Sequence, residues 1–384
     1  MSEKVKLGDV CKVQGGYAFK SKQFQKNKIP IVRIGNIQDN QVEIDYSVCY
    51  TEEFLNMHPE FEIQDGDILI AMSGATVGKI GKYKNDKKAL LNQRVGNFIT
   101  TEKLEKGYLY FLLQSPLFEK YILNNAFGCA QPNISSKKIE EFEFYLYDNK
   151  EQMEITNQLD KIQKIVDIRK KQIEQLDELI KSQFVEMFEN VEETVRLGDC
   201  CNVHARIGWQ ALTKSEHMQN GDYMLITGTD FRNNEIDYST CVYVSKERYE
   251  MDKNIILKND DILITKDGTI GKVAIVHNLI KPATLNGGVF VVRPKEMFNK
   301  EYIAYVFKGP LFTDFVNKSK TGATIKHLNQ KHLVEFEIPI PTLEEQIRFS
   351  NIYKQVDKQK TEIQKSLEEM KKLQESLMNK YFGE

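Results

Sequence analysis

The side chains best suited to chemistry in this sequence are lysines that lie among amides and hydroxyls. Residues 315–334, FVNKSKTGATIKHLNQKHLV, contain lysines but no acidic residue. Residues 127–138, FGCAQPNISSKK, combine two lysines with Gln, Asn and Ser. Lysine anchors phosphates, whereas amides and hydroxyls bond to base edges, so this mixture suits a DNA surface. A single stretch of this kind is more often just a solvated face, but its recurrence in equivalent places favours DNA contact.

A third basic stretch surrounds a pair of glycines at residues 74–79, GATVGK. Three residues separate these glycines instead of four, and Ile80 follows the lysine instead of Ser or Thr, which argues against a nucleotide-hydrolysing phosphate loop. GTIGK at residues 268–272 departs further from that motif. Two interpretations stay open. The segment is a tight glycine turn between strands, or it is a turn whose Lys79 or Lys272 reaches a DNA phosphate.

No pattern for catalysis or metal binding accompanies these stretches. The prolines never form the PPY or PPF triplet typical of adenine methyltransferases, and GxSxG and HExxH are absent. The six cysteines form no CxxC pair and have no histidine at zinc spacing, so we expect reduced thiols. The sequence therefore predicts no catalytic residue, no metal site and no cofactor in this chain.

The composition is that of a globular protein of two or three domains. The chain has 384 residues, of which 41% are hydrophobic and 28% charged. No run of about 18 apolar residues predicts a membrane span, and MSEKVKLGDV lacks a signal region, so we expect no membrane contact and a cytoplasmic location. The net charge of −2 means that DNA contact must come from local patches.

The elements that must position these side chains occur twice. VKLGDVCKV at residues 5–13 returns as VRLGDCCNV at 195–203, and DILIAMSGATVGKI at 67–80 returns as DILITKDGTIGKV at 261–273. One unit of about 190 residues is thus repeated. Runs of β-branched residues predict short strands in each copy, and residues 107–123 and 300–316 predict short helices. We expect an α+β fold with two mixed α/β globular parts.

Each copy ends in a segment without Gly or Pro, residues 151–188 and 345–382, which predicts a long helix. Apolar residues recur at alternating spacings of three and four, as in a coiled coil. A helix of this length spans roughly 57 Å and needs a partner of similar length, so we expect the two helices to pair. The predicted seam contains Leu159, Ile162, Val166, Ile173, Leu176, Ile180, Val356, Ile363, Leu367, Met370 and Leu377.

This arrangement resembles the specificity subunit of type I restriction-modification enzymes along the whole chain. The resemblance is carried by GGYAFKSKQF at residues 15–24, IPIVRIGNI at 29–37, GDILIAMSGATVGK at 66–79, AQPNIS at 130–135, HARIGWQALT at 204–213 and IPIPTLEEQ at 338–346. It implies target-recognition domains at residues 1–150 and 191–342, each reading one half of a split, asymmetric DNA site. The helical segments 151–190 and 343–384 would form the antiparallel spacer between them.

The resemblance also implies the partners. The chain would be non-catalytic and would bind double-stranded DNA and two methyltransferase subunits, which bind S-adenosylmethionine and methylate a flipped adenine. A restriction subunit that uses ATP and Mg is an optional further partner. The alternative is a coiled-coil scaffold with two interaction domains and no DNA role, for which the near-neutral net charge is the best support.

Comparison of the two copies selects candidate DNA contacts. Features shared by both copies cannot distinguish two different half-sites, so we expect base reading where the copies differ. The predicted base-edge contacts are Lys20, Gln131, Asn133, Arg206, Thr324, Lys326 and His327. Tyr17 and Trp209 are predicted to contact bases or sugars, with packing inside a loop as the alternative. The other predicted DNA contacts are the cationic Lys79, Arg94, Lys137, Lys272, Lys320 and Lys331.

Replacing residues 1–150 with a recognition domain of different specificity tests the predicted modularity. Only one half of the DNA target should change, because each domain is expected to read its half independently. Sequencing of methylated adenines in cells that carry the hybrid chain and its partners would show the new target. A change in both halves would contradict the domain assignment.

Overall fold

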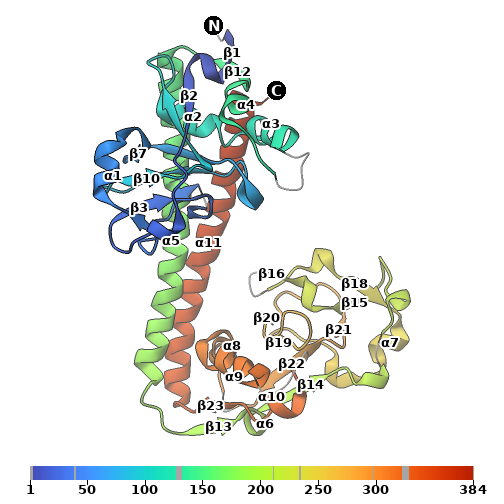
Figure 1. Ribbon diagram of the computed structural model, residues 1–384. Coiled ribbons are helices and arrows are strands. Elements are labelled where there is room, and N and C mark those ends of the chain that lie inside the picture. Colours follow the sequence, from blue (N-terminus) through green and yellow to red (C-terminus); the bar gives the residue numbers. More distant parts are fainter. Residues whose placement is uncertain are drawn as a thin grey trace. The chain divides into compact units, whose positions relative to one another are not determined.

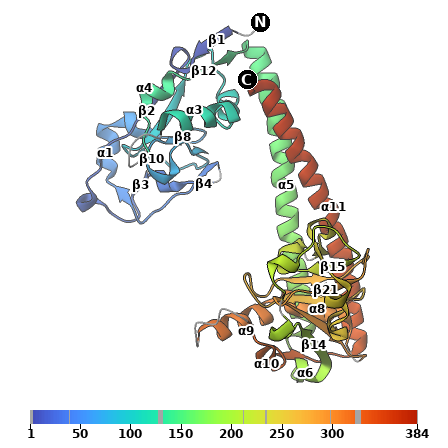
Figure 2. The same ribbon diagram turned by 90° about the vertical axis from the view of Figure 1, so that its right-hand side faces the viewer.

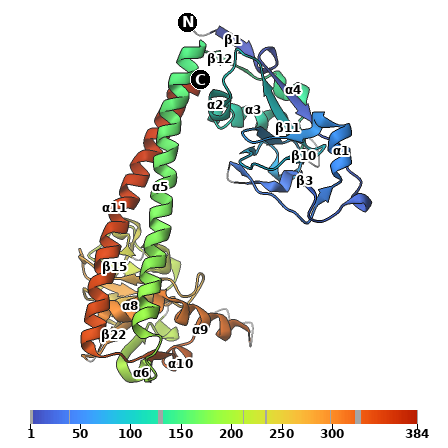
Figure 3. The same cartoon turned by 90° about the vertical axis from the view of Figure 1, so that its left-hand side faces the viewer.

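The computed structural model describes residues 3–38, 40–126, 132–210, 212–232, 235–296, 298–321 and 328–383. Two helices of 40 residues each, α5 (Asn149–Phe188) and α11 (Leu343–Phe382), lie side by side in Figure 1 and in the turned views of Figure 2 and Figure 3. The chain divides into two compact units, Met1–Lys171 with Gln364–Glu384 and Gln172–Ile363. Each unit combines one globular part with a portion of both long helices.

Two sheets and a two-stranded ribbon form the globular part of the first unit. The larger sheet has the order β2-β11-β8-β9-β5-β4, the smaller has β6-β3-β10-β7, and β1 pairs with β12. Most pairs are antiparallel, while β3–β10 and β5–β9 are parallel. The strands are β1 (Glu3–Lys6), β2 (Cys11–Gly15), β3 (Ile29–Val32), β4 (Ile37–Gln38), β5 (Gln41–Val42), β6 (Cys49–Tyr50), β7 (Glu62–Ile63), β8 (Ile68–Ala71), β9 (Ile80–Lys82), β10 (Ala89–Leu91), β11 (Val95–Thr100) and β12 (Glu143–Leu146).

The second unit repeats this topology. Its sheets have the orders β14-β22-β19-β20 and β18-β15-β21, beside the pairs β13–β23 and β16–β17. The parallel pair β15–β21 corresponds to β3–β10, so the predicted internal repeat and the mixed fold class are confirmed. The strands are β13 (Thr194–Arg196), β14 (Cys201–Ala205), β15 (Tyr223–Ile226), β16 (Phe231–Arg232), β17 (Glu235–Ile236), β18 (Val242–Val244), β19 (Ile262–Thr265), β20 (Val273–Ile275), β21 (Ala283–Leu285), β22 (Val289–Pro294) and β23 (Glu337–Pro339).

Helices cover one side of the larger sheet in each unit. Pro116 and Pro310 are the first residues of α3 and α9, where the missing proline N–H leaves no intrahelical bond unmade. Among the described helices, none has a stretch that is both apolar and long enough for a membrane span. The shorter helices are α1 (Glu52–Met57), α2 (Lys106–Leu112), α3 (Pro116–Ala126), α4 (Ser136–Glu140), α6 (Leu197–Cys200), α7 (Lys246–Glu250), α8 (Lys300–Lys308), α9 (Pro310–Thr321) and α10 (Gln330–Leu333).

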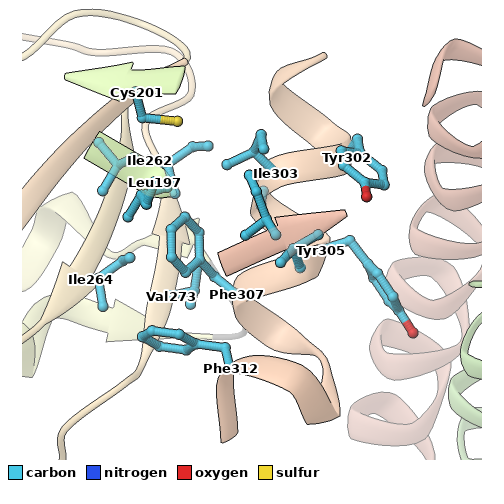
Figure 4. Close-up of a cluster of buried hydrophobic side chains, with 14 of the residues drawn as sticks. Leu197, Cys201, Ile262, Ile264, Val273, Tyr302, Ile303, Tyr305, Phe307 and Phe312 are labelled. Carbon is cyan, nitrogen blue, oxygen red and sulfur yellow. The ribbon is translucent and has the colours of Figure 1, made fainter. Parts of the chain in front are cut away.

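The strands β8 and β19 separate two apolar cores in their units. Every residue of both strands is buried, and successive side chains point to opposite faces of a strand. Ile262 and Ile264 therefore join the helix-side core, in which Figure 4 shows them with Ile303 and Phe307. Leu263, between them in sequence, lies in the second core, which the β15 sheet completes. Both strands are apolar apart from the buried Thr265 at the end of β19, because both of their faces are covered.

The long helices run antiparallel, as three side-chain contacts show. Residues of rising number on α5 contact residues of falling number on α11: Gln158 with Tyr381 at 3.0 Å, Gln163 with Gln374 at 2.7 Å and Asp177 with Lys360 at 2.6 Å. Residues of the predicted seam are all at least half-buried. Leu159, Ile162, Val166, Ile180 and Val356 are buried, and Ile173, Leu176, Ile363, Leu367, Met370 and Leu377 are partly buried.

Aromatic side chains embed the long helices in the globular parts. In the second unit Phe184 of α5 lies 5.0 Å from Tyr305 of α8 and 5.4 Å from Phe349 of α11, between ring centroids. In the first unit Tyr108 of α2 lies 5.1 Å from Phe382 of α11. Each such ring buries a large apolar area. The helix ends are therefore part of the globular cores.

A buried glutamine joins each long helix to the cap of a neighbouring helix. Gln152 accepts a hydrogen bond from the Glu105 backbone N–H at 2.8 Å and donates to the Lys103 and Tyr147 carbonyls. Glu105 is the N-cap of α2. In the second copy Gln346 accepts from the N–H of Asn299, the N-cap of α8. Equivalent glutamine side chains thus fix the helix junction in the two units.

Replacing Gln152 with Leu should destabilise the first unit. The change leaves three buried backbone groups without a hydrogen-bond partner. Each unsatisfied group costs about 1–3 kcal/mol, so the free energy of unfolding should fall by about 3 kcal/mol or more. Asn157→Leu is the matched control because that side chain is exposed on the same helix and has no hydrogen bond among the described contacts, and it should change stability by less than about 0.5 kcal/mol. Urea unfolding measures both, and equal stabilities would refute the role of the buried amide.

Candidate nucleic-acid interface

The turn after β8 and the equivalent turn after β19 each contain two glycines in the left-handed region. Gly74 and Gly78 have φ angles of 76° and 85°, and Gly268 and Gly271 have 67° and 88°. Only glycine adopts this left-handed region readily, so the predicted tight turn is confirmed. A Cβ on Gly78 would also lie 2.7 Å from Ile122. The turn leaves the following Lys79 exposed, and Lys272 is exposed in the second copy.

Backbone hydrogen bonds gather predicted DNA contacts around the first turn. Met72 N–H donates to the Arg94 carbonyl at 2.9 Å, and Ile134 N–H donates to the Met72 carbonyl at 2.9 Å. Asn133 forms a β-bridge with Ser73. These bonds join the turn before Lys79 to Arg94 and Asn133, both exposed. Lys137, also exposed, follows in α4.

The loop after β2 is attached to the same region. Tyr17 N–H donates to the Leu91 carbonyl at 2.8 Å, and Gln93 N–H donates to the Tyr17 carbonyl at 2.9 Å, so Tyr17 is hydrogen-bonded to the residue before Arg94. Tyr17 is 38% exposed, and its ring centroid lies 4.9 Å from that of Phe54. Lys20 is exposed further along this loop. Gln131 lies outside the described residues.

The second unit repeats this framework with different side chains. Lys266 N–H donates to the Gly288 carbonyl and Leu328 N–H donates to the Lys266 carbonyl, both at 2.9 Å. These residues occupy the places of Met72, Arg94 and Ile134. The second unit thus has Gly288 at the place of Arg94, and the nearby cation is the partly buried Lys266, whose Nζ lies 5.5 Å from the Phe290 ring centroid. Lys266 was not predicted from the sequence, although its alignment with Met72 in the two copies of the turn motif was a usable signal.

The chain matches the sequence model of one protein family over most of its length. This family is described as the type I restriction modification DNA specificity domain, and residues 2–178 and 189–372 each match it. The chain belongs to this family. Both repeats are therefore DNA specificity domains, and the resemblance found in the sequence is confirmed.

Individual relatives agree with this assignment. The MjaVIII specificity subunit of Methanocaldococcus jannaschii is 32% identical over 47% of this chain and 43% of its own length. The EcoBI specificity subunit of Escherichia coli is 23% identical over 99% of this chain and 85% of its own. The S subunit structure from M. genitalium superimposes with a TM-score of 0.66 at 16% identity, covering 100% of this chain and 96% of that one. That superposition shows the shared fold.

Arg206 of the second specificity domain requires a correction. It was predicted to reach a base edge, but it is 2% exposed. Its Nε donates to the Leu285 carbonyl at 2.8 Å and its Nη2 to the Thr284 hydroxyl at 3.2 Å. A guanidinium held by β21 inside the domain is not available to DNA. The prediction failed because the partners of Arg206 lie some 80 residues away in sequence.

The other predicted contacts of the second specificity domain have mixed outcomes. Lys272 and Lys331 are exposed. Lys320 lies in α9 (Pro310–Thr321) and Trp209 in the 3-10 turn Gly208–Gln210, but the side chains of both lie outside the described part of the structure. Thr324, Lys326 and His327 also lie outside the described residues, so these predictions stay predictions.

Ion pairs divide the basic side chains of the first specificity domain into two groups. Lys88 pairs with Glu62, Lys106 with Asp67 and Lys138 with Glu141, at 3.1, 3.1 and 2.7 Å. Among the described contacts, Lys79, Arg94 and Lys137 form no ion pair. Because paired lysines are partly neutralised, Lys79, Arg94 and Lys137 are among the cations of this domain whose charge is available to phosphates. In the described residues no cluster of His, Cys, Asp and Glu is arranged as a metal site.

Removing charge near the glycine turn should weaken DNA binding regardless of sequence. The double substitution Lys79→Ala with Arg94→Ala should lower affinity for any duplex and reduce the slope of log affinity against log salt by about 1 per lost phosphate contact. Lys88→Ala is the matched control, since Lys88 is already paired with Glu62. Fluorescence anisotropy of the assembled complex over a salt series measures both. An unchanged slope in the double variant would place the phosphate contacts elsewhere.

Proposed function

We propose that this chain is the specificity subunit that directs adenine methylation to a bipartite, asymmetric DNA site. The first specificity domain reads one half of the site and the second reads the other half. The DNA between the two half-sites is not read, because the two domains are separate parts of one chain. The chain contributes recognition and assembly, while its partners contribute the chemistry.

The observation that carries this proposal is a common framework with unlike loops. The Leu91 carbonyl of β10 accepts the Tyr17 backbone N–H, whereas the equivalent Leu285 carbonyl of β21 accepts the Arg206 side chain. The strands that the two domains share have the same order, and each domain has two left-handed glycines in the equivalent turn. A protein that read two identical half-sites would have no need for two different loop structures. Strands that both domains share, together with loops that differ between them, therefore support an asymmetric target.

The internal repeat also supports the stoichiometry. Two equivalent frameworks offer two equivalent positions for a partner, so we assign two methyltransferase subunits to one copy of this chain, with double-stranded DNA. Each methyltransferase would bind S-adenosylmethionine and flip its target adenine out of the duplex. A restriction subunit that requires ATP and Mg would be a further partner of the same assembly. The names of the relatives, which are specificity subunits of type I restriction enzymes, support this assignment.

Deleting this chain alone from cells that also carry its methyltransferase partner tests the proposal. Sequencing of methylated adenines should show a split, asymmetric motif that disappears with the chain and returns when the chain is restored. Expression of the methyltransferase must be verified in both strains. The loss should be complete, because the methyltransferase would lack its means of recognising the site.

The competing function is a scaffold with two protein-interaction domains. Unchanged adenine methylation after deletion, with the methyltransferase present, would favour that function. Salt-sensitive duplex binding by the purified complex would argue against it, because phosphate contacts release counterions and lose affinity as salt rises.

A further inference from the structure

Equivalent loops in the two specificity domains start and end at equivalent positions. The first loop, residues 16–25, begins after β2 and ends at the bridge between Gln25 and Cys49. The second, residues 206–218, begins after β14 and ends at the bridge between Met218 and Tyr243. The second loop is three residues longer, and Ala211 within it lies outside the described residues. The two loops therefore differ between fixed endpoints, where half-site specificity is expected to differ.

The first loop is held by a backbone bond and by aromatic packing. Tyr17 N–H bonds to the Leu91 carbonyl at 2.8 Å. The rings of Tyr17 and Phe19 lie 4.9 and 5.1 Å from the ring of Phe54 on α1. Gly16 permits this path, because a Cβ there would lie 2.2 Å from the Leu91 carbonyl oxygen. These anchors are apolar contacts and backbone bonds, with no ion pair among the described contacts.

The second loop is held at the same two places by guanidinium groups. Arg206, at the position equivalent to Gly16, donates to the Leu285 carbonyl at 2.8 Å and makes a longer bond of 3.4 Å to the Arg248 carbonyl of α7. The Arg248 side chain donates from Nε to Glu216 at 2.6 Å. Glu216 accepts from the Thr213 N–H at 2.8 Å. The loop is thus joined to β21 at its start and to α7 near its end.

The charges of Glu216 and Arg248 keep this network formed near neutral pH. The Thr213 backbone N–H and then Arg248 lower the pKa of Glu216 to about 2, so its carboxylate is ionised at any pH near neutrality. Within the described part of the chain, Arg206 forms no ion pair and its Nη1 has no hydrogen-bond partner. A buried cation satisfied only by carbonyls and a hydroxyl is expensive to retain. The hydrogen bonds of Arg206 to β21 and α7 therefore offset the free energy that its burial costs.

We propose that Arg206 positions the base-reading loop of the second specificity domain by linking it to β21 and α7. This inference rests on the proposed function, since it assigns specificity for one half-site to the loop. Arg206 acts through the loop and does not touch DNA. Phe54 on α1 has the equivalent task in the first domain, with aromatic contacts in place of hydrogen bonds.

The test is the substitution Arg206→Lys in the full chain, assembled with its methyltransferase partner. Lysine keeps the charge but lacks the fork that reaches two carbonyls and a hydroxyl together. Methylation of duplexes that carry the target, or a single-base change in either half-site, gives the discrimination in each half. Discrimination in the second half should fall about tenfold, within the range that one misplaced bidentate contact produces. Discrimination in the first half should stay at the wild-type value.

Arg293→Lys is the matched control for stability. Arg293 lies in the same domain and makes two bonds of 2.7 Å to Asp261, together with bonds to the Asn254 and Ile256 carbonyls. It does not contact the loop among the described contacts, so its substitution should lower the melting temperature and leave discrimination unchanged. Unchanged discrimination in Arg206→Lys, or an equal loss in Arg293→Lys, would overturn the positioning role.

A second variant keeps the test decisive if Arg206→Lys does not assemble. Glu216→Gln weakens the other end of the network at a partly exposed side chain, and it should also reduce discrimination only in the second half. Wild-type discrimination in a well-folded Glu216→Gln complex would then overturn the proposal. A wild-type complex that methylates without any sequence preference would refute the proposed function instead.

Discussion

Burial of one apolar stripe along each 40-residue helix is the constraint on which the rest of the structure depends. Neither helix can cover its stripe alone, so the two pair antiparallel through Leu159, Val166 and Val356. Toward its ends each helix is covered by a globular part, through rings such as Phe184 and Phe382. The compact units therefore cut through both helices and do not end at the helix boundaries. A specificity domain without its helix segments would expose part of its own core.

The two copies of the repeat share the features suited to any DNA duplex and differ in the features suited to a particular base sequence. Strand order, the left-handed glycines and the buried junction amides are present in both domains. They fix backbone positions, and phosphates are spaced alike in every duplex. The loops after β2 and β14 differ in length, path and anchoring chemistry. Because base edges vary from site to site, loops that differ on a shared framework are the part suited to reading them.

Much of the fold was predictable from the sequence because its signals are local. The alternating seam, the strands and the glycine turn follow from periodicity and from the backbone preference of glycine. The roles of single cations were harder to predict. Arg206 and Lys79 are both cationic residues near a loop, but only Arg206 meets the Leu285 carbonyl in the interior. Lys266 was not predicted, because the glycine-lysine motif of the second copy indicates Lys272. Burial and partner choice depend on distant segments, which one sequence does not reveal.

The two anchoring schemes limit what genetic exchange can achieve between the halves of this chain. Moving the second loop alone into the first domain would place an arginine at Gly16, where a Cβ meets the Leu91 carbonyl oxygen at 2.2 Å. It would also leave Glu216 without Arg248, because Phe54 occupies that position on α1. The smallest segment that can be exchanged therefore includes the loop, its supporting helix and the strand that receives it. If these loops read bases as proposed, a new half-site specificity would have to be exchanged together with its supports.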